Sequence, residues 1–408
     1  ILTGGPGTGK TTTVRSLLTC LDALQVTYAL CATTGRASKQ LSASTGRQAA
    51  TVHRHLGLGP RQEEIEPVRE AVLVIDESSM LDLWLMDQIV ARLTEDTVLL
   101  LVGDVDQLPS VGPGAILQDL IAAGEGGQAP RIAVVRLSAI FRQEAGSESL
   151  IVLNCHRIRA GERPLKGKGA QSDYFEMFCE TPQEARALAV DLVVNRLPKY
   201  LSVPPTEVQV LAPMHAGEAG IRMLNQALQE ALNPPKPGMP ELNLSGGAQS
   251  ESGRALRVGD KVRQTQNNYQ KLVFNGDLGF VSRIAPADRL VLVTYDERTV
   301  AYSFEELDQL VHAWAMTVHS AQGSQWPAVV IIMLTNQYVM LERNILYTAL
   351  SRAQRLAVLI SQEQALRVAV AQARSTQRRT NLQTRLQHAL AGPETLHRPP
   401  VHTGRLFD

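Results

Sequence analysis

The feature that most constrains this chain is a phosphate-binding loop that begins at its fourth residue. Residues 4–11 read GGPGTGKT, which fits the P-loop pattern GxxxxGK[ST]. The glycines let backbone N–H groups turn inward around phosphate oxygens, and the helix expected over residues 10–24 presents its positive N-terminus to them. A strand comes before such a loop and a helix after it, so the motif predicts an α/β fold.

The P-loop also predicts which residues bind a nucleoside triphosphate. We expect Lys10 to reach the terminal phosphates and the Thr11 hydroxyl to ligate Mg²⁺. The full set of expected nucleotide-binding residues is Gly5, Pro6, Gly7, Thr8, Gly9, Lys10, Thr11 and Thr12. The cofactors predicted by the motif are therefore ATP and Mg²⁺.

Two short apolar runs, residues 71–75 (AVLVI) and 97–102 (TVLLLV), are typical of strands buried on both faces of a parallel sheet. Asp76 and Glu77 end the first run, at the edge of the sheet where ligands bind. We expect Asp76 to hold Mg²⁺ through water and Glu77 to orient and deprotonate the attacking water, which favours hydrolysis over binding alone. The alternative is an acidic surface pair that caps the next helix.

Three further residues fit the needs of hydrolysis. Gln107 follows the second buried run, and its neutral amide can sense the γ-phosphate. An arginine finger at the leaving phosphate contributes roughly 10³–10⁵ in rate. Arg142, in LSAIFRQ, and Arg352, in LYTALSRAQ, are the two candidates for that role.

The second half of the chain contains another α/β pattern with a β-rich stretch inside it. The α/β pattern has expected helices at 182–196, 217–232 and 342–352 and expected strands at 208–211, 329–334 and 356–360. The expected strands of the β-rich stretch are 261–264, 278–284, 289–295 and 299–304. Such close strand spacing favours a small antiparallel barrel inserted in the second α/β domain. Residues 234–252 are rich in Pro, Gly and Ser and are predicted to form a loop or linker.

Composition narrows the class of protein but does not select a ligand. Forty basic residues balance forty acidic ones, so a nucleic acid would need a local basic groove. Cys20, Cys31, Cys155 and Cys179 are widely spaced, which favours free thiols in a reducing compartment. We expect no membrane span. The sequence starts at Ile1, only three residues before the P-loop, and we infer that an N-terminal part is missing.

Ten motifs in a fixed order resemble a superfamily 1 helicase of the RecD-like branch. They are GGPGTGKTT (4–12), ATTGRASKQL (32–41), TVHRHLG (51–57), VIDESSM (74–80), LVGDVDQLPSVGPG (101–114), LSAIFRQ (137–143), LAPMHAGEAGIRMLNQALQEALNP (211–234), GDKVRQTQNNYQKLVFNGDLG (259–279), AMTVHSAQGSQ (315–325) and LYTALSRAQ (346–354). The resemblance implies an α/β protein with two RecA-like P-loop domains and a small SH3-like β-barrel inserted in the second. The corresponding ranges are 1–160 for the first domain with a small insert at about 57–70, 161–258 and 312–375 for the second, 259–311 for the barrel, and 376–408 for a polar, solvated tail.

The resemblance also implies an activity and a DNA path. It implies an ATP-dependent motor that moves 5′→3′ along single-stranded DNA and unwinds duplex at single-strand to double-strand junctions, with Arg142 and Arg352 as its two arginine fingers. The residues it places against DNA are Thr33, Thr34, Arg36, Thr51, His53, Thr317, His319, Asn268 and Tyr269. Asn268 and Tyr269 have two open roles, a DNA contact or a fixed loop. We expect a monomer in the cytoplasm, associated with the nucleoid.

The chain departs from the family pattern at one motif, and two other functions stay open. Ser320 and Ala321 stand where the family has Lys-Ser, and Gln325 replaces a glutamate, which puts contacts at positions 320 and 325 in doubt. One alternative is a P-loop ATPase that switches conformation on a protein partner. The other is a helicase module of a larger nuclease or relaxase.

Overall fold

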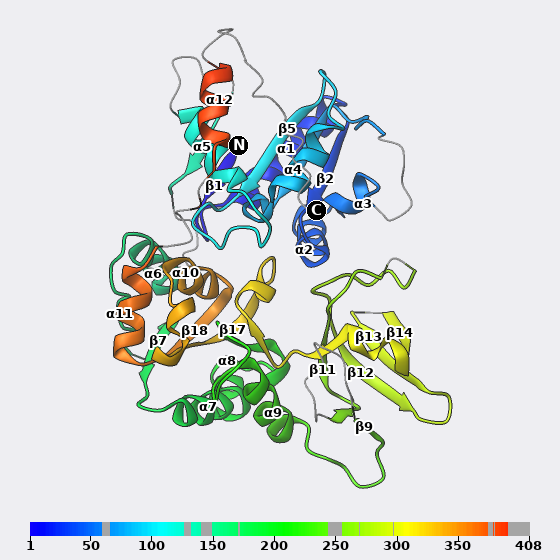
Figure 1. Ribbon diagram of the computed structural model, residues 1–408, viewed down its shortest axis with the longest axis vertical. Coiled ribbons are helices and arrows are strands. Elements are labelled where there is room, and N and C mark those ends of the chain that lie inside the picture. The colour runs from blue at the N-terminus through cyan, green and yellow to red at the C-terminus, as the bar shows by residue number, and fades with distance from the viewer. Residues whose placement is uncertain are drawn as a thin grey trace, which may run out of the picture.

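The computed structural model describes residues 1–58, 66–125, 132–139, 149–169, 172–243, 255–268, 270–296, 298–373, 378 and 380–390. Among these residues, strands form two parallel sheets, a separate five-stranded antiparallel sheet and a two-stranded antiparallel pair. In Figure 1 the first parallel sheet and its helices, here called the first lobe, lie at the top. The second lobe lies at lower left, and the antiparallel unit lies at lower right.

The first lobe is a six-stranded sheet with the strand order β3-β2-β4-β5-β1-β6. Its strands are β1 (Leu2–Gly4), β2 (Tyr28–Ala32), β3 (Ala50–Thr51), β4 (Val72–Asp76), β5 (Val98–Gly103) and β6 (Val135–Leu137). Its helices are α1 (Lys10–Ala23), α2 (Gly35–Thr45), α3 (Val52–His55), α4 (Leu83–Val90) and α5 (Ile116–Glu125). The pairings of these strands are parallel, so their carboxyl ends meet at one edge of the sheet.

The central strands of the first lobe are buried on both faces, as the continuous apolar runs predict. Leu73 and Ile75 of β4 belong to the hydrophobic core on one side of the sheet, together with Ile116 of α5. Val74 of β4 belongs to the core on the other side, together with Val14 of α1. Since neighbouring residues of a strand point to opposite faces, this alternation explains the lack of polar residues in the run.

The second lobe is a five-stranded sheet with the strand order β16-β8-β17-β18-β7. Its strands are β7 (Tyr174–Phe178), β8 (Val208–Ala212), β16 (Ala315–Thr317), β17 (Trp326–Met333) and β18 (Ala353–Ser361). Its helices are α6 (Leu150–Arg159), α7 (Pro182–Asp191), α8 (Leu197–Leu201), α9 (Ile221–Leu232), α10 (Arg343–Ser351) and α11 (Glu363–Ala371). A π-helical turn, Leu192–Arg196, joins α7 to α8, and short 3₁₀ helices cover Ser78–Met80, Pro205–Glu207, Phe304–Gln309, His319–Ala321 and Thr335–Met340.

The antiparallel unit is encoded between β8 and β16, two neighbouring strands of the second sheet. Its five strands have the order β14-β13-β12-β11-β15. They are β11 (Lys261–Gln264), β12 (Leu278–Ala285), β13 (Leu290–Tyr295), β14 (Arg298–Ser303) and β15 (Leu310–His312). A further pair, β9 (Glu241–Asn243) and β10 (Ala255–Arg257), precedes them, so part of the predicted 234–252 linker is a strand.

Two boundaries differ from the sequence-based prediction. The predicted first domain runs to residue 160, but Ile151, Cys155 and Ile158 of α6 are buried in the core of the second lobe. The predicted solvated tail begins at 376, but α12 (Leu382–Leu390) packs beside α5 of the first lobe (Figure 1). The chain therefore passes from the first lobe to the second and returns to the first.

The returning segment is bound to the first lobe by polar contacts before α12 begins. The guanidinium of Arg378 donates to the carbonyl oxygens of Ser110 at 2.6 Å, Gly112 at 2.8 Å and Gly114 at 2.8 Å. The hydroxyl of Thr380 donates to a carboxylate oxygen of Asp119, in α5, at 2.9 Å. Leu382 packs against the core of the first lobe. These contacts make the segment a connection between the lobes, and its described residues, 372–373, 378 and 380–390, are here called the return segment.

Candidate nucleotide site between the lobes

The loop between β1 and α1 curls around a hollow at the carboxyl edge of the first sheet. Gly7 and Gly9 have φ angles of 75° and 86°, a left-handed conformation that glycine adopts without strain. The Nζ of Lys10 donates hydrogen bonds to the carbonyl oxygens of Gly4 at 2.5 Å and Gly5 at 2.9 Å. These bonds hold the ammonium group inside the curl, where an anionic phosphate oxygen would be a stronger partner than a neutral carbonyl.

The acidic pair lies beside this loop, at the end of β4. An Oδ of Asp76 accepts a hydrogen bond from the backbone N–H of Glu77 at 2.8 Å. Glu77 has a φ of 52°, a strained conformation for a residue other than glycine, and strain of this kind is often found at functional sites. Burial, and then the charge of Glu77, raises the pKa of Asp76 to about 7. A cation bound beside Asp76 would lower that pKa and keep the carboxylate charged.

Arg352 brings a positive charge from the second lobe to the same hollow. It follows the last residue of α10, and only 2% of its surface is exposed. Its Nη2 donates to the side-chain oxygen of Gln107 at 2.7 Å, and its Nη1 lies 3.8 Å from an Oε of Glu77. Thus the structure brings together three residues that the sequence separates, namely Glu77, Gln107 and Arg352.

These groups line a cavity of about 280 Å³ between the two lobes. Its lining includes the P-loop residues Gly5, Pro6, Gly7, Thr8, Gly9, Lys10, Thr11 and Thr12. It also includes Asp76, Glu77, Gln107, Gln325 and Arg352. All the predicted nucleotide-binding, metal-binding and catalytic residues that the structure describes therefore surround one cavity. Arg142 lies outside the described residues.

Sequence reasoning missed residues that join the lobes next to this cavity. The hydroxyl of Tyr347 in α10 donates to a carboxylate oxygen of Asp104 at 2.8 Å. The backbone N–H of Leu108 donates to the hydroxyl of Thr348 at 2.9 Å, and the side-chain amide of Gln322 donates to the carbonyl of Leu108 at 2.8 Å. Asp104 and Tyr347 lie inside motifs that were recognised, but no local pattern indicates that they meet.

Three threonines predicted to contact DNA, Thr33, Thr34 and Thr51, lie at the same carboxyl edge of the first sheet. Ala32, the last residue of β2, pairs with Thr51 of β3, so Thr33 and Thr51 lie close together. The hydroxyl oxygen of Thr34 accepts from the N–H of Ala37 at 3.2 Å, and that of Thr51 accepts from the N–H of Arg54 at 3.1 Å. Both hydroxyls therefore cap helices, and each keeps an O–H that can donate to another acceptor.

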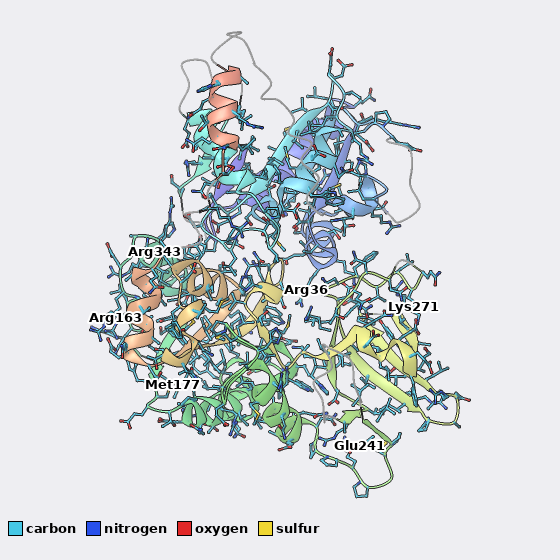
Figure 2. All side chains as sticks on the ribbon, in the orientation of Figure 1. Arg36, Arg163, Met177, Glu241, Lys271 and Arg343 are labelled. Atoms are coloured by element: carbon cyan, nitrogen blue, oxygen red, sulfur yellow. The ribbon has the colours of Figure 1, made fainter. Side chains whose placement is uncertain are left out.

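Arg36 crosses from the first lobe toward the second. Figure 2 places it between the first lobe and the two units below it, and its guanidinium carbon lies 4.7 Å from the ring centroid of Trp326 in β17. Burial lowers the pKa of Arg36 to about 10, so the side chain stays charged at neutral pH. Its Nη1 is buried without a hydrogen-bond partner among the described residues. A phosphate oxygen is the kind of group that would satisfy it.

The second-lobe candidates lie around the turn after β16. The hydroxyl of Thr317 donates to the hydroxyl of Ser320 at 2.9 Å, so the serine that replaces the family lysine fixes this turn. Burial lowers the pKa of His319, which keeps its imidazole neutral at neutral pH. Gln325, the other departure from the family pattern, lines the nucleotide cavity.

Asn268 holds a loop of the antiparallel unit. Its backbone pairs with that of Val273, and its side-chain oxygen accepts from the N–H of Lys271 at 3.1 Å. These bonds support the loop-fixing role left open by the sequence. Tyr269 lies outside the described residues.

Three findings concern other classes of site. None of the helices in the described ranges combines the length and the apolar character that crossing a bilayer requires. The residues that the structure describes contain no cluster of three or more His, Cys, Asp or Glu side chains arranged to hold a metal. None of the four cysteines, all of which the structure describes, forms a disulfide.

Three family models match successive parts of the chain. Residues 1–113 match the AAA domain, residues 224–295 match the ATP-dependent RecD-like DNA helicase SH3 domain, and residues 312–360 match the UvrD-like helicase C-terminal domain. The SH3 match covers most of the antiparallel unit and the helix before it.

Curated relatives extend these matches over most of the chain. The ATP-dependent RecD2 DNA helicase of Deinococcus radiodurans is 39% identical over 357 residues, which cover 87% of this chain and 46% of that protein. The RecBCD enzyme subunit RecD of Mycolicibacterium smegmatis is 30% identical over 431 residues, which cover 95% of this chain and 72% of that subunit. The chain thus spans less than half the length of the first protein and nearly three quarters of the second.

Solved structures support the fold. A Bacteroides Pif1 helicase in complex with ADP-AlF3 and single-stranded DNA has a TM-score of 0.54 at 20% identity, covering 96% of this chain and 92% of that one. A Pif1 structure, described as a basis for DNA unwinding at forked dsDNA by two coordinating Pif1 helicases, has a TM-score of 0.52, also at 20% identity, covering 88% of this chain and 86% of that one. These likenesses establish an α/β helicase fold.

Proposed function

Since the chain belongs to the RecD family of helicases, we propose that it is an ATP-dependent motor that moves 5′→3′ along single-stranded DNA and unwinds duplex. The observation that carries the proposal is the position of Arg352. This residue belongs to the second lobe, yet it bonds Gln107 and lies 3.8 Å from Glu77 in the first. A site assembled from both lobes can convert hydrolysis into a change in their relative position. The direction of movement rests on the family alone.

The proposed architecture is two RecA-like domains with an SH3-like barrel inserted in the second. The parallel sheets of the two lobes, each covered by helices, support the first part. The SH3 family match and the location of the antiparallel strands between β8 and β16 support the second. We place the boundary between the domains before α6 rather than at residue 160, because α6 belongs to the second core.

In the proposed reaction, Lys10 binds the terminal phosphates and Glu77 accepts a proton from the attacking water. Gln107 positions the γ-phosphate region, and Arg352 stabilises the negative charge that develops on the phosphates. Arg142 remains the candidate for a second finger on the evidence of its motif.

The residues next to the P-loop fit a bound magnesium ion. Mg²⁺ takes oxygen donors and keeps several waters, and it commonly binds one or two protein groups together with substrate phosphates. Thr11 offers a hydroxyl and Asp76 a carboxylate, both at the wall of the cavity. When bound, the ion would neutralise charge on the phosphates, while the protein residues orient the water and the leaving group.

The contacts between the lobes explain how this reaction would drive movement. A nucleotide held by Lys10 on one side and Arg352 on the other favours the closed cleft, because only that state makes both contacts. Phosphate release would remove one side of the bridge and allow opening. If the two lobes grip DNA in alternation, each cycle advances the protein along the strand.

The proposed DNA grip does not depend on base sequence. Thr33, Thr34, Arg36 and Thr51 come from the first lobe, and Thr317 and His319 come from the second. Hydroxyl and guanidinium groups bind the phosphate backbone that every strand shares. A motor that must pass over any sequence needs such contacts.

Strand displacement on matched duplexes tests the proposal. One duplex has a 5′ single-stranded tail, and the other has a 3′ tail of the same length. We expect unwinding of the 5′-tailed duplex only, and single-stranded DNA should stimulate ATP hydrolysis. Lys10→Ala, which removes the phosphate-binding ammonium, should lose both activities. Unwinding from the 3′ tail would contradict the direction, and near-normal turnover by Lys10→Ala would contradict the whole assignment of the site.

The relatives suggest a second candidate function for this chain. Several of them are subunits of the RecBCD enzyme, so this chain could instead be the motor part of a larger nuclease assembly. Unwinding by the isolated chain would favour a self-sufficient motor. ATP hydrolysis that DNA fails to stimulate would favour a switch acting on a protein partner.

A further inference from the structure

A pair of aromatic rings lies on the first lobe outside the nucleotide cavity. His53 in α3 and Trp84 in α4 have ring centroids 6.0 Å apart, with their planes at 29°. Trp84 is 53% exposed, whereas Trp314 and Trp326 are 5% and 4% exposed. Of the three tryptophans in the chain, only Trp84 presents its ring to solvent.

Among the residues that the structure describes, the packing of α4 gives no reason for a tryptophan at this position. Leu85 and Ile89 are the buried residues that hold the helix in the core. Asp82 caps the helix by accepting a hydrogen bond from the N–H of Leu85 at 2.8 Å. The indole of Trp84 therefore remains largely outside the core, although a tryptophan gains most of its stabilising effect from buried area.

The location of the pair is more informative than its packing. His53 lies two residues after Thr51 in the sequence. Thr51 pairs with the last residue of β2, and Thr33 is the residue that directly follows β2. These threonines are at the edge proposed to hold phosphates of the strand. Where phosphates are held at regular intervals, the bases attached to them need a neighbouring surface. An exposed ring next to the grip provides one.

The state of His53 also fits a ring surface better than a phosphate contact. Burial lowers the pKa of His53, although the carboxylate of Asp82 acts in the opposite direction. The imidazole is therefore neutral at pH 7. A neutral ring backing the indole orients it without repelling or attracting the strand.

We propose that Trp84, supported by His53, is a stacking platform for the bases of single-stranded nucleic acid. This inference rests on the proposed function and adds a base-contacting residue to a grip that otherwise consists of phosphate contacts. Every base has a π-face, so stacking on an aromatic ring tolerates any sequence. The platform thus suits the same sequence-independent motor.

Binding of two probes to matched variants tests the platform. The probes are a dT oligonucleotide and a strand of the same length in which abasic sites replace the bases. The variants are Trp84→Ala, Trp84→Phe and, as a control, Tyr200→Ala, which removes an aromatic side chain of the second lobe that is 47% exposed. We expect Trp84→Ala to weaken binding of the dT strand by about tenfold, the effect typical of one lost stacking partner. Its affinity for the abasic strand should not change, and Trp84→Phe should retain most of the dT affinity.

Tryptophan fluorescence gives a second measurement on the intact chain. The dT strand should quench the emission of the wild-type protein more than that of Trp84→Ala, and the abasic strand should quench both equally. Equal weakening of both probes, or no weakening of either, would overturn the platform. If single-stranded DNA still stimulates ATP hydrolysis in that case, the proposed function survives. If the wild-type protein binds neither probe, both the function and the platform are wrong.

Discussion

Arg352 contacts one neutral and one negatively charged side chain of the first lobe. Its Nη2 donates to the neutral Gln107 at 2.7 Å, and its Nη1 lies 3.8 Å from the carboxylate of Glu77. Its Nη1 also donates to the carbonyl of Ser324 at 3.3 Å, which holds the guanidinium to its own lobe. The side chain is therefore already oriented before a nucleotide arrives, and little reorganisation is needed when charge develops.

We expect Arg352→Ala to bind ATP with nearly normal affinity and to hydrolyse it about 10³-fold more slowly, because an arginine finger acts on the transition state. Nucleotide binding by fluorescence titration and single-turnover hydrolysis measure the two quantities separately. Arg355→Ala, which removes an exposed arginine three residues further on, is the matched control. A loss confined to nucleotide affinity would argue against the finger role.

Asp76 links the stability of the protein to pH. Burial and the charge of Glu77 raise its pKa from an ordinary value of 3.8 to about 7. The folded protein thus holds this proton more tightly than the unfolded chain does. The resulting contribution to stability is complete below pH about 4 and is lost as the pH rises through about 7.

From this linkage we expect Asp76→Asn to melt at a higher temperature than the wild-type protein at pH 8, with a smaller difference at pH 5. The asparagine cannot ionise, and its side-chain oxygen can still accept from the N–H of Glu77. Calorimetry in EDTA without nucleotide gives the comparison. Asp288→Asn, the same substitution at an exposed turn, is the matched control. The same gain in melting temperature at both pH values would contradict the raised pKa of Asp76.

At the scale of secondary-structure elements, the segment after β16 packs closely against the start of α2. Gly323 has a φ of 70°, and a Cβ added there would lie 2.8 Å from the hydroxyl oxygen of Thr34 and 3.1 Å from the Cβ of Ala37. The two sides of this contact belong to different lobes. Opening the cleft would relieve the crowding without unfolding either lobe.

Gly323→Ala should therefore disfavour the closed cleft and lower ATP turnover by about tenfold or more. Gly238→Ala is a close control, because Gly238 has a φ of 79° but no atom of the described residues lies within 4 Å of the added Cβ. Both variants carry similar backbone strain, of order 1 kcal/mol, so their melting temperatures should fall equally. Equal ATP turnover in the two variants would show that the contact between lobes does not matter.

The sequence predicted the elements whose patterns are continuous and failed where tertiary context decides. The runs at 71–75 and 97–102 are confirmed as β4 and β5, each displaced by one residue. The strand β7 (YFEMF) was missed because it is short and contains Glu176, which breaks the apolar run. The helix predicted at 182–196 continues through a π-turn to Leu201. Pro198 cannot donate a backbone hydrogen bond, which accounts for the local widening.

The candidate site was predictable as far as local motifs extend. Lys10, Asp76 and Glu77 each follow or precede a recognisable strand or helix. The bond between Tyr347 and Asp104 joins residues 243 positions apart, and Leu108 is buried in the core of the other lobe. Such pairs arise only when the lobes close on each other, so no local periodicity indicates them.

For the whole molecule, the return segment makes the described part of the chain begin and end on the first lobe. Arg378 donates to three carbonyls of the loop that follows Gln107. Hydrogen bonds from a charged donor contribute about 1.5–3 kcal/mol each. We expect Arg378→Ala to lower the free energy of unfolding by about 2 kcal/mol or more and to speed hydrogen exchange in residues 108–115.

The same variant should also turn over ATP several-fold more slowly, because Gln107 precedes the loosened loop. Hydrogen exchange by mass spectrometry locates the effect, and steady-state hydrolysis measures its consequence. Arg385→Ala removes an exposed arginine from α12 and leaves the carbonyl contacts intact. Unchanged exchange in Arg378→Ala would mean that the loop holds its shape without the guanidinium.

The return segment also limits how far the two lobes can separate at the cleft. Gln372 is tied to the second lobe, since its carbonyl accepts from the N–H of Arg343 at 2.8 Å, and Arg378 is tied to the first. Six residue steps separate these two anchors, and a fully extended chain of that length spans about 20 Å. As long as both anchors hold, opening of the cleft cannot carry them further apart than this. The amplitude of opening is thus capped by chain length, independently of what nucleotide or DNA binds.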